Sequence, residues 1–317
     1  LETLDIYIAP LTNPDGAEYD IQTGNYRWHR KNTRINSDKS VGVDLNRNYD
    51  WEWGPQWPGS SSNPDSETYR GTSPFSEPET QRVRDALALQ PPSLSMSCHS
   101  YADLLLYPWG YNTIYTPDDA LYSSIGNAMT SENGWSAGTI WELLYIANGG
   151  SVDYHYGVYD TIAYTPEIGN DTDGFWPTPS RIPALQASTL PMHQRAAKWA
   201  GAWATRTSEE WQEIIGDGDT DREPGESWSL ALRIRNEGLL ALNGMLSLSS
   251  SDPDVQVVGA PQNLVAAPRS EIVSGAFTLN FSPQAATGVI YALDLGFEFE
   301  GFLTTEERTN TIRVDSR

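Results

Sequence analysis

The hydrophobic periodicity of this chain changes near residue 206, and this change limits the possible folds more than any other feature. Before it, short apolar runs that suit strands, such as Leu94 to Cys98, alternate with longer runs that suit helices. After it, apolar and polar residues alternate one by one along stretches such as 228–234 and 291–299. The pattern predicts an α/β layered domain followed by an all-β sandwich.

The same change divides the chain. A length of 317 residues is enough for one large domain and one smaller domain. We expect an α/β domain at residues 1–206, a linker at 207–218 and a β-sandwich at 219–317. The sequence predicts these elements in the first domain: a strand from Leu4 to Ala9, a turn at Asn13–Gly16, a helix opened by the capping box Ser76–Glu79 and ending near Leu89, strands at Leu94–Cys98 and Leu104–Tyr107, and a long helix over Arg181–Arg206.

Composition excludes some partners and features. The 42 acidic and 20 basic residues give a formal charge of −22, which repels nucleic acid and anionic membrane surfaces, so we expect neither as a partner. No apolar run has the length of a transmembrane helix. Cys98 is the single cysteine, so the chain has no internal disulfide.

Several polar residues of types used in binding and catalysis follow apolar segments of the first domain. Asn46 and Arg47 are adjacent in a tight loop, where an amide and a guanidinium can bind a carboxylate through charge-assisted hydrogen bonds. His99 follows an apolar strand and suits a metal such as zinc. Glu167 ends another apolar strand and suits a general base. Singly, each residue is explained as well by a structural role, but their order and spacing together indicate a site.

That combination strongly resembles the M14 zinc metallocarboxypeptidases, the family of pancreatic carboxypeptidases A and B and bacterial carboxypeptidase T. The run VDLNRN at residues 43–48 and the interval of 22 positions from Tyr145 to Glu167 carry the resemblance, which covers about residues 1–206. It implies a mixed-sheet carboxypeptidase-like domain and a zinc-dependent enzyme that releases C-terminal amino acids from peptides or proteins.

The resemblance also implies roles for individual residues. It implies His99 as a zinc ligand, Glu167 as the base that activates water, and Asp44 as a carboxylate that orients another zinc ligand. The residues that would bind substrate are Asn46, Arg47 and Tyr145 at the terminal carboxylate, Ser100 and Tyr101 at the next subsite, and Val152 at the floor of the C-terminal side-chain pocket. Because Val152 is apolar, we expect a preference for hydrophobic or aromatic C-terminal residues. The resemblance leaves the oxyanion-stabilising arginine open, because Thr33 interrupts the usual spacing. Arg34 is favoured, since the run Arg34–Asn36 has an Arg-x-Asn pattern that also occurs in relatives, and Arg30 is the second choice.

One part of the family pattern is missing. A His-x-x-Glu pair would supply two zinc ligands, but the residues three positions after the four histidines are Asn32, Ala102, Val158 and Ala196. We therefore expect that the domain lacks its N-terminal part, that the other zinc ligands lie upstream of Leu1, and that this chain alone is inactive. His155 and His193 are interpreted as structural.

Rival interpretations remain. The main one is a non-catalytic pseudoenzyme that binds peptide C-termini, although retention of Glu167 argues against it. A peptidase of cell-wall peptides, or a scaffold or adhesion protein whose sandwich is the active part, is also compatible with the sequence.

The start of the second domain is acidic. Asp217, Asp219, Asp221 and Glu226 place carboxylates at intervals that suit calcium, and a solvated acidic linker explains them equally well. The segment resembles the openings of β-sandwich modules appended to secreted bacterial hydrolases. This resemblance implies an Ig-like sandwich and a secreted, extracellular protein, and it leaves the ligand of the sandwich open.

Overall fold

The structure, a computed structural model, describes residues 4–299, 302–304 and 310–314. The chain divides into two compact units: an α/β unit at Ile6–Ala197 and a β unit that includes the residues from Lys198 onward. The elements of the first unit, with the last helix running into the second, are α1 (Pro14–Ile21), η1 (Leu45–Arg47), α2 (Pro78–Leu89), β1 (Leu94–Met96), β2 (Leu104–Tyr107), α3 (Asp119–Thr130), β3 (Ser136–Thr139), α4 (Ile140–Leu143), α5 (Ser151–Tyr159), β4 (Ile162–Glu167), η2 (Pro179–Arg181) and α6 (Ile182–Ala200).

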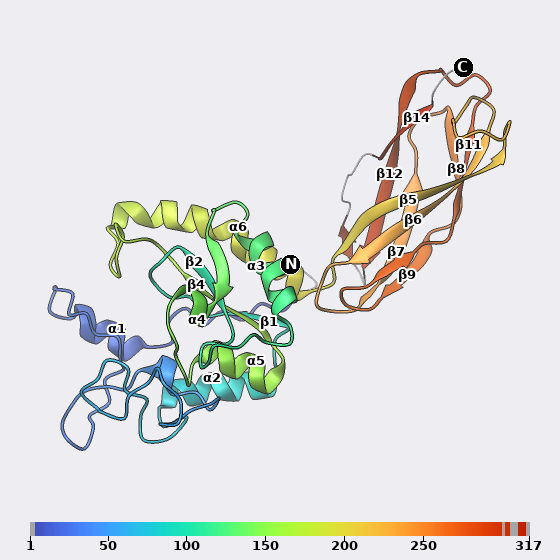
Figure 1. Ribbon diagram of the computed structural model, residues 1–317. Helices are drawn as coiled ribbons and strands as arrows, with labels where there is room; N and C mark the ends of the chain where they lie inside the picture. Colours follow the sequence, from blue (N-terminus) through green and yellow to red (C-terminus); the bar gives the residue numbers. More distant parts are fainter. Residues whose placement is uncertain (1–3, 300–301, 305–309, 315–317) are drawn as a thin grey trace. The chain divides into compact units, whose positions relative to one another are not determined.

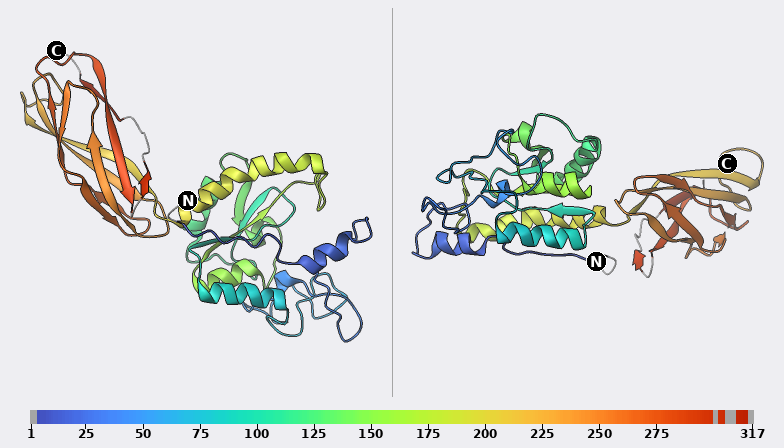
Figure 2. Two further views of the ribbon diagram at one scale, coloured as in Figure 1. Left: turned by 180° about the vertical axis from the view of Figure 1, so that it is seen from behind. Right: turned by 90° about the horizontal axis from the view of Figure 1, so that it is seen from below.

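A four-stranded mixed sheet forms the centre of the α/β unit, in the order β1-β4-β2-β3. Strand β4 runs parallel to β1 and antiparallel to β2, while β2 runs parallel to β3. Figures 1 and 2 show α2 and α5 on one face of this sheet and α3 and α6 on the other. Because helices cover both faces, every residue of β4 is buried. The mixed sheet predicted from the family resemblance is thus confirmed.

Two predictions near the N-terminus are wrong. Residues Leu4 to Ala9 form no strand: the segment has no ladder partner among the described residues, and the side chains of Tyr7 and Ile8 are 73% and 79% exposed. An apolar alternation favours an extended backbone, but a strand also needs a paired neighbour. The expected turn at Asn13–Gly16 is instead the start of α1, because the Asn13 side chain accepts the Gly16 N–H at 3.1 Å.

The predicted helices exist with shifted ends. Helix α2 begins at Pro78 as expected, but Glu77, its N-cap residue, makes no side-chain cap hydrogen bond. The Glu77 carboxylate instead accepts hydrogen bonds from the side chains of Arg34 and Asn32. Helix α6 ends at Ala200 rather than Arg206 and contains Pro191 in its interior.

In the described part of the β unit, ten strands, β5 to β14, form two antiparallel sheets. Their bounds are β5 (Ala204–Ile215), β6 (Ser227–Asn236), β7 (Leu242–Ser249), β8 (Val255–Val258), β9 (Gln262–Ala266), β10 (Glu271–Val273), β11 (Phe277–Phe281), β12 (Val289–Phe299), β13 (Phe302–Thr304) and β14 (Asn310–Val314). The buried side chains of both sheets form one core, with Leu230, Leu246 and Phe277 among its least exposed members. The Ig-like assignment stays a prediction.

The linker expected at 207–218 is not a linker over most of its length. Residues 207–215 belong to β5, which pairs with β6 along nearly its whole length. Glutamates and threonines make this strand look like a loop, but its outer face is exposed and tolerates them. Among the described residues, no helix is both long enough and apolar enough to cross a membrane.

Candidate active site

A cavity of about 300 Å³ lies beside the carboxyl ends of β1 and β4. This is the edge at which sheets of parallel strands usually present their functional side chains. Its lining includes Arg30, Asp44, Asn46, His99 and Ser100. The cavity lining therefore joins residues that are up to 163 positions apart in the sequence, from Thr12 to Phe175.

Parallel pairing of β1 with β4 places His99 next to Glu167. The two residues form an isolated bridge just past the end of β1, with the His99 N–H donating to the Pro166 carbonyl and the Ile168 N–H donating to the His99 carbonyl, each at 2.8 Å. Burial, opposed by the positive charge of Arg30, raises the pKa of Glu167 to about 7. Burial lowers the pKa of His99 to about 4, so its ring is neutral at pH 7, which is the form that binds metals. A carboxyl group with a raised pKa and a neutral imidazole thus belong to residues that pair at the ends of neighbouring strands.

A short helix, η1, positions the residues predicted to bind a carboxylate. Asp44 caps it by accepting the Asn46 N–H at 3.2 Å. The Arg47 side chain is 2% exposed, and its guanidinium donates to the carbonyls of Gly59 at 2.8 Å and Asn46 at 2.6 Å. Two backbone contacts therefore fix the orientation of a buried cation.

Helix α5 and the segment before it complete this corner. The Asn46 side chain accepts the Ser151 N–H at 2.9 Å, which joins η1 to the start of α5. The ring centre of Tyr145 lies 5.9 Å from Cζ of Arg47, and this tyrosine is 53% exposed. Val152 is buried at 3% exposure. The structure thus brings Asn46, Arg47 and Tyr145 together, as the resemblance implies.

The two candidate oxyanion arginines lie in different surroundings. Arg34 donates to the Glu77 carboxylate at 2.5 Å, and Glu77, which is 1% exposed, also accepts from Asn32 at 2.8 Å. Arg30 lines the cavity and donates to Asp44 at 2.9 Å. The geometry favours Arg30, the second choice of the sequence analysis. The sequence could not separate the two, because Glu77 lies 43 positions from Arg34.

The donors around His99 do not by themselves fit a catalytic zinc ion. Such a site takes three protein ligands, and within the described residues no trio of His, Cys, Asp or Glu donors gathers at His99. The other histidines bond elsewhere: His155 contacts the Ser95 hydroxyl at 2.9 Å, and His193 contacts the Thr189 carbonyl at 2.8 Å. Both contacts agree with the structural roles expected for them.

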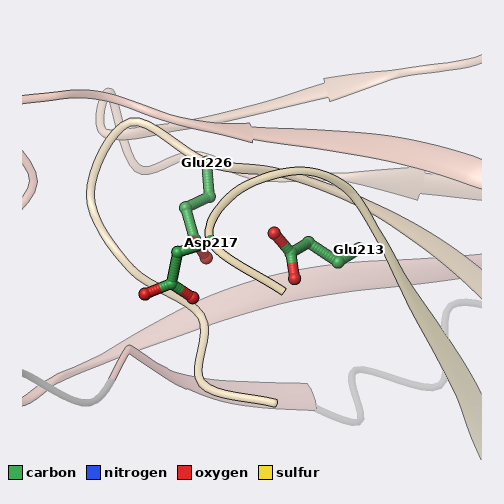
Figure 3. Close-up of side chains that lie close together, drawn as sticks. All are labelled: Glu213, Asp217 and Glu226. Atoms are coloured by element: carbon green, nitrogen blue, oxygen red, sulfur yellow. The ribbon is translucent and has the colours of Figure 1, made fainter. Parts of the chain in front are cut away.

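One acidic trio does occur among the described residues, in the β unit. Carboxylate oxygens of Glu213, Asp217 and Glu226 lie within 4.8 Å of one another (Figure 3). The predicted calcium set differs, since Asp219 accepts the Asp221 N–H at 2.7 Å, within the loop itself. Sequence reasoning missed Glu213 because it assigned this part of β5 to a linker. Calcium binding here stays a prediction.

Comparisons with known proteins agree with the α/β unit. Residues 1–191 match the sequence profile of the zinc carboxypeptidases. The chain is 38% identical over 175 residues to carboxypeptidase A1 of Mus musculus, covering 53% of this chain and 41% of the relative. It is 37% identical over 177 residues to a zinc carboxypeptidase of Simulium vittatum, covering 53% of this chain and 57% of the relative.

A solved structure gives the same result. The carboxypeptidase A from Helicoverpa armigera aligns with a TM-score of 0.55 and 31% identity, over 60% of this chain and 50% of that chain. The chain thus spans about half the length of the relatives it matches. Because the profile match covers more than half of the residues, the chain belongs to the zinc carboxypeptidase family.

Proposed function

We propose that the α/β unit binds the C-terminal end of peptides and supplies the base for removal of the last amino acid by hydrolysis. The observation that carries this proposal is the arrangement around one cavity. Asn46 and His99 line this cavity, buried Arg47 adjoins Asn46 and Tyr145, and Glu167, whose pKa is raised to about 7, pairs with His99. A terminal carboxylate suits this guanidinium because it accepts two charge-assisted hydrogen bonds, and Asp44, 4.0 Å from Arg47, already offsets part of the buried charge.

Each residue has a role in this scheme. Arg47 and Asn46 would bind the terminal carboxylate, and the exposed ring of Tyr145 would cover it. Glu167 would accept a proton from the attacking water, which a pKa near 7 favours at neutral pH. Arg30, at the cavity wall, would stabilise the negative charge that develops on the carbonyl oxygen.

Hydrolysis and binding make different demands on the chain. Zinc carboxypeptidase activity needs metal ligands in addition to His99, because His99 alone does not fit the ion. Carboxylate binding needs only residues that the structure describes. The alternative is a non-catalytic binder of peptide C-termini, and the buried Glu167, for which such a binder has no need, favours the enzyme.

Peptide affinity tests the part of the proposal shared by both alternatives. We expect a peptide with a free C-terminal carboxylate to bind the chain more tightly than the same peptide amidated. Arg47→Gln should weaken binding of the free acid by about tenfold to a hundredfold, since hydrogen bonds to charged groups contribute about 1.5–3 kcal/mol. Arg82→Gln, on the exposed face of α2, is the matched control. Equal affinity for acid and amide would refute the proposal.

Hydrolysis then separates the two alternatives. The enzyme alternative predicts zinc-dependent release of C-terminal Phe in preference to Lys, because buried Val152 offers no counter-charge, and loss of release in Glu167→Gln. Chromatography of the released amino acid and the zinc content after dialysis are the measurements. Carboxylate-dependent binding without bound zinc and without release would establish the non-catalytic binder, while faster release of Lys would contradict the specificity.

A further inference from the structure

Four aromatic side chains form a continuous surface beside the cavity, which we call the aromatic platform: Tyr26, Trp28, Phe175 and Trp176. Tyr26 stacks on Trp176 with ring centres 5.1 Å apart and contacts Trp28 at 4.7 Å, while Trp28 meets Phe175 edge-on at 6.0 Å. Trp28, Phe175 and Trp176 are 64%, 46% and 58% exposed. Single exposed apolar residues are common, but a contiguous exposed group of this size indicates a binding surface.

Hydrogen bonds from the two neighbouring residues to one buried carboxylate hold Trp28 in place. The Asp20 carboxylate, which is buried, accepts the N–H of Arg27 at 2.9 Å and of His29 at 3.0 Å, the residues on either side of Trp28. Between them Trp28 has a φ of 63°, a left-handed conformation that is unfavourable for a bulky side chain. Backbone strain of this kind persists where neighbouring contacts enforce it and is common at ligand-binding sites.

The platform is continuous with the candidate active site. Phe175 belongs both to the platform and to the cavity lining. It also contacts Tyr101 with ring centres 4.8 Å apart, and Tyr101 follows Ser100, another lining residue. A peptide with its terminal carboxylate at Arg47 and its preceding residues at Ser100 and Tyr101 would therefore lead its upstream part onto the platform.

We propose that Tyr26, Trp28 and Trp176 bind apolar or aromatic side chains of the peptide substrate that lie further upstream of the cleaved bond than those at Ser100 and Tyr101. This inference rests on the proposed function. The platform offers ring faces and edges with few polar groups, which suits apolar side chains and gives aromatic ones favourable stacked or edge-on contacts. The occupant is a peptide because the platform continues from a cavity assigned to peptide C-termini.

Calorimetric titration of the full chain with two peptides tests the proposal. Both peptides end in free Phe; one carries only Gly upstream, and the other carries Trp and Leu at the third to fifth positions from the end. We expect the Trp/Leu peptide to bind about tenfold more tightly, equivalent to about 1.4 kcal/mol. Trp28→Ala combined with Trp176→Ala should abolish this preference while leaving affinity for the Gly peptide unchanged.

Matched variants distinguish the loss of aromatic contacts from a loss of folding. Trp28→Phe with Trp176→Phe keeps two aromatic rings and should retain most of the preference, and Trp176→Ala alone gives a milder change if the double variant fails to fold. Leu89→Ala removes a side chain that is 87% exposed on α2, outside the platform, and should have no effect.

The outcomes separate this inference from the function on which it rests. Loss of the free-carboxylate requirement in the Gly peptide would overturn the proposed function. An unchanged Trp/Leu preference in folded alanine variants, with the carboxylate requirement intact, would overturn only the platform. Binding of a chito-oligosaccharide that the alanine variants abolish, without any peptide preference, would also overturn it and assign the surface to carbohydrate.

Discussion

The carboxyl group of Asp153 allows a direct test of the energetics of the α/β unit. Asp153 lies in the first turn of α5 and is 1% exposed. Both of its oxygens accept the Gly110 N–H at 2.9 Å, and one accepts the Tyr111 N–H at 3.0 Å. These donors, and the nearby charge of Arg47, favour the ionised form, whereas burial favours the neutral form. Burial has the larger effect and raises the pKa of Asp153 to about 7.

This pKa implies a definite dependence of stability on pH. Because the folded-state pKa is raised above the usual value of 3.8, the folded protein binds more protons than the unfolded chain between about pH 4 and pH 7. The contribution of Asp153 to the free energy of unfolding is therefore full below pH 4 and is lost as pH rises through 7. With these two pKa values the loss is on the order of 2–3 kcal/mol between pH 5 and pH 8.

Asp153→Asn removes the titration and keeps the size of the side chain. We expect the free energy of unfolding of the wild type, measured relative to Asp153→Asn, to fall by roughly 2–3 kcal/mol from pH 5 to pH 8. Urea denaturation of both proteins at each pH is the assay, and Asp171→Asn, at an exposed position, is the control. A flat difference, or a wild type that gains stability towards pH 8, would show that the three hydrogen bonds outweigh burial and would refute the reasoning.

Three further predictions test an ion pair and the packing of the α/β unit, and a hydrogen-bond network of the β unit. Arg34→Gln should lower thermal stability by about 1.5–3 kcal/mol, because it removes the cation that pairs with buried Glu77. Arg30→Gln should mainly impair any hydrolysis. The reverse result in melting and activity assays would exchange the roles of the two arginines. Gly157→Ala should destabilise the protein by about 1–3 kcal/mol, because a Cβ at this position would lie 2.4 Å from the Trp51 ring. Since alanine by itself favours helices, a higher melting temperature of the variant would contradict this packing. Asn236→Ala should cost at least about 3 kcal/mol in urea denaturation, since this fully buried amide joins five backbone groups of the β unit, and a loss below 1 kcal/mol would argue against that network.

Local sequence was sufficient where a few neighbouring residues determine the geometry. In the run at residues 43–48, Asp44 caps η1 and places Asn46 and Arg47 at its end. The residue that determines the local geometry is therefore part of the motif itself. Val152 lies in α5 and Tyr145 lies six positions before its start, close enough in sequence for their spacing to predict that they are neighbours. The alternation of apolar residues likewise predicted β6, because one face of that strand is buried.

Sequence reasoning failed where the deciding contact is distant. The choice between Arg30 and Arg34 depends on Glu77, which engages Arg34 from the start of α2. The segment from Leu4 to Ala9 has the alternation of a strand, but pairing decides that assignment. Glu213 reaches Glu226 only because β5 pairs with β6, a partnership that the composition of β5 conceals.

The two parts of the proposed function, carboxylate binding and metal-dependent hydrolysis, also differ in whether the contacts that they need are present in the described α/β unit. Carboxylate binding depends on η1, on the start of α5 and on backbone carbonyls that fix Arg47, all within the described α/β unit. Metal binding depends on donors that must meet His99 from elsewhere, and the described residues do not supply them. We therefore predict that added zinc leaves the affinity of the chain for a peptide carboxylate unchanged, and that Arg47→Gln weakens this affinity by about tenfold to a hundredfold whether or not zinc is present. A carboxylate affinity that appeared only with zinc would show that the metal, rather than Arg47, is the primary anchor of the substrate.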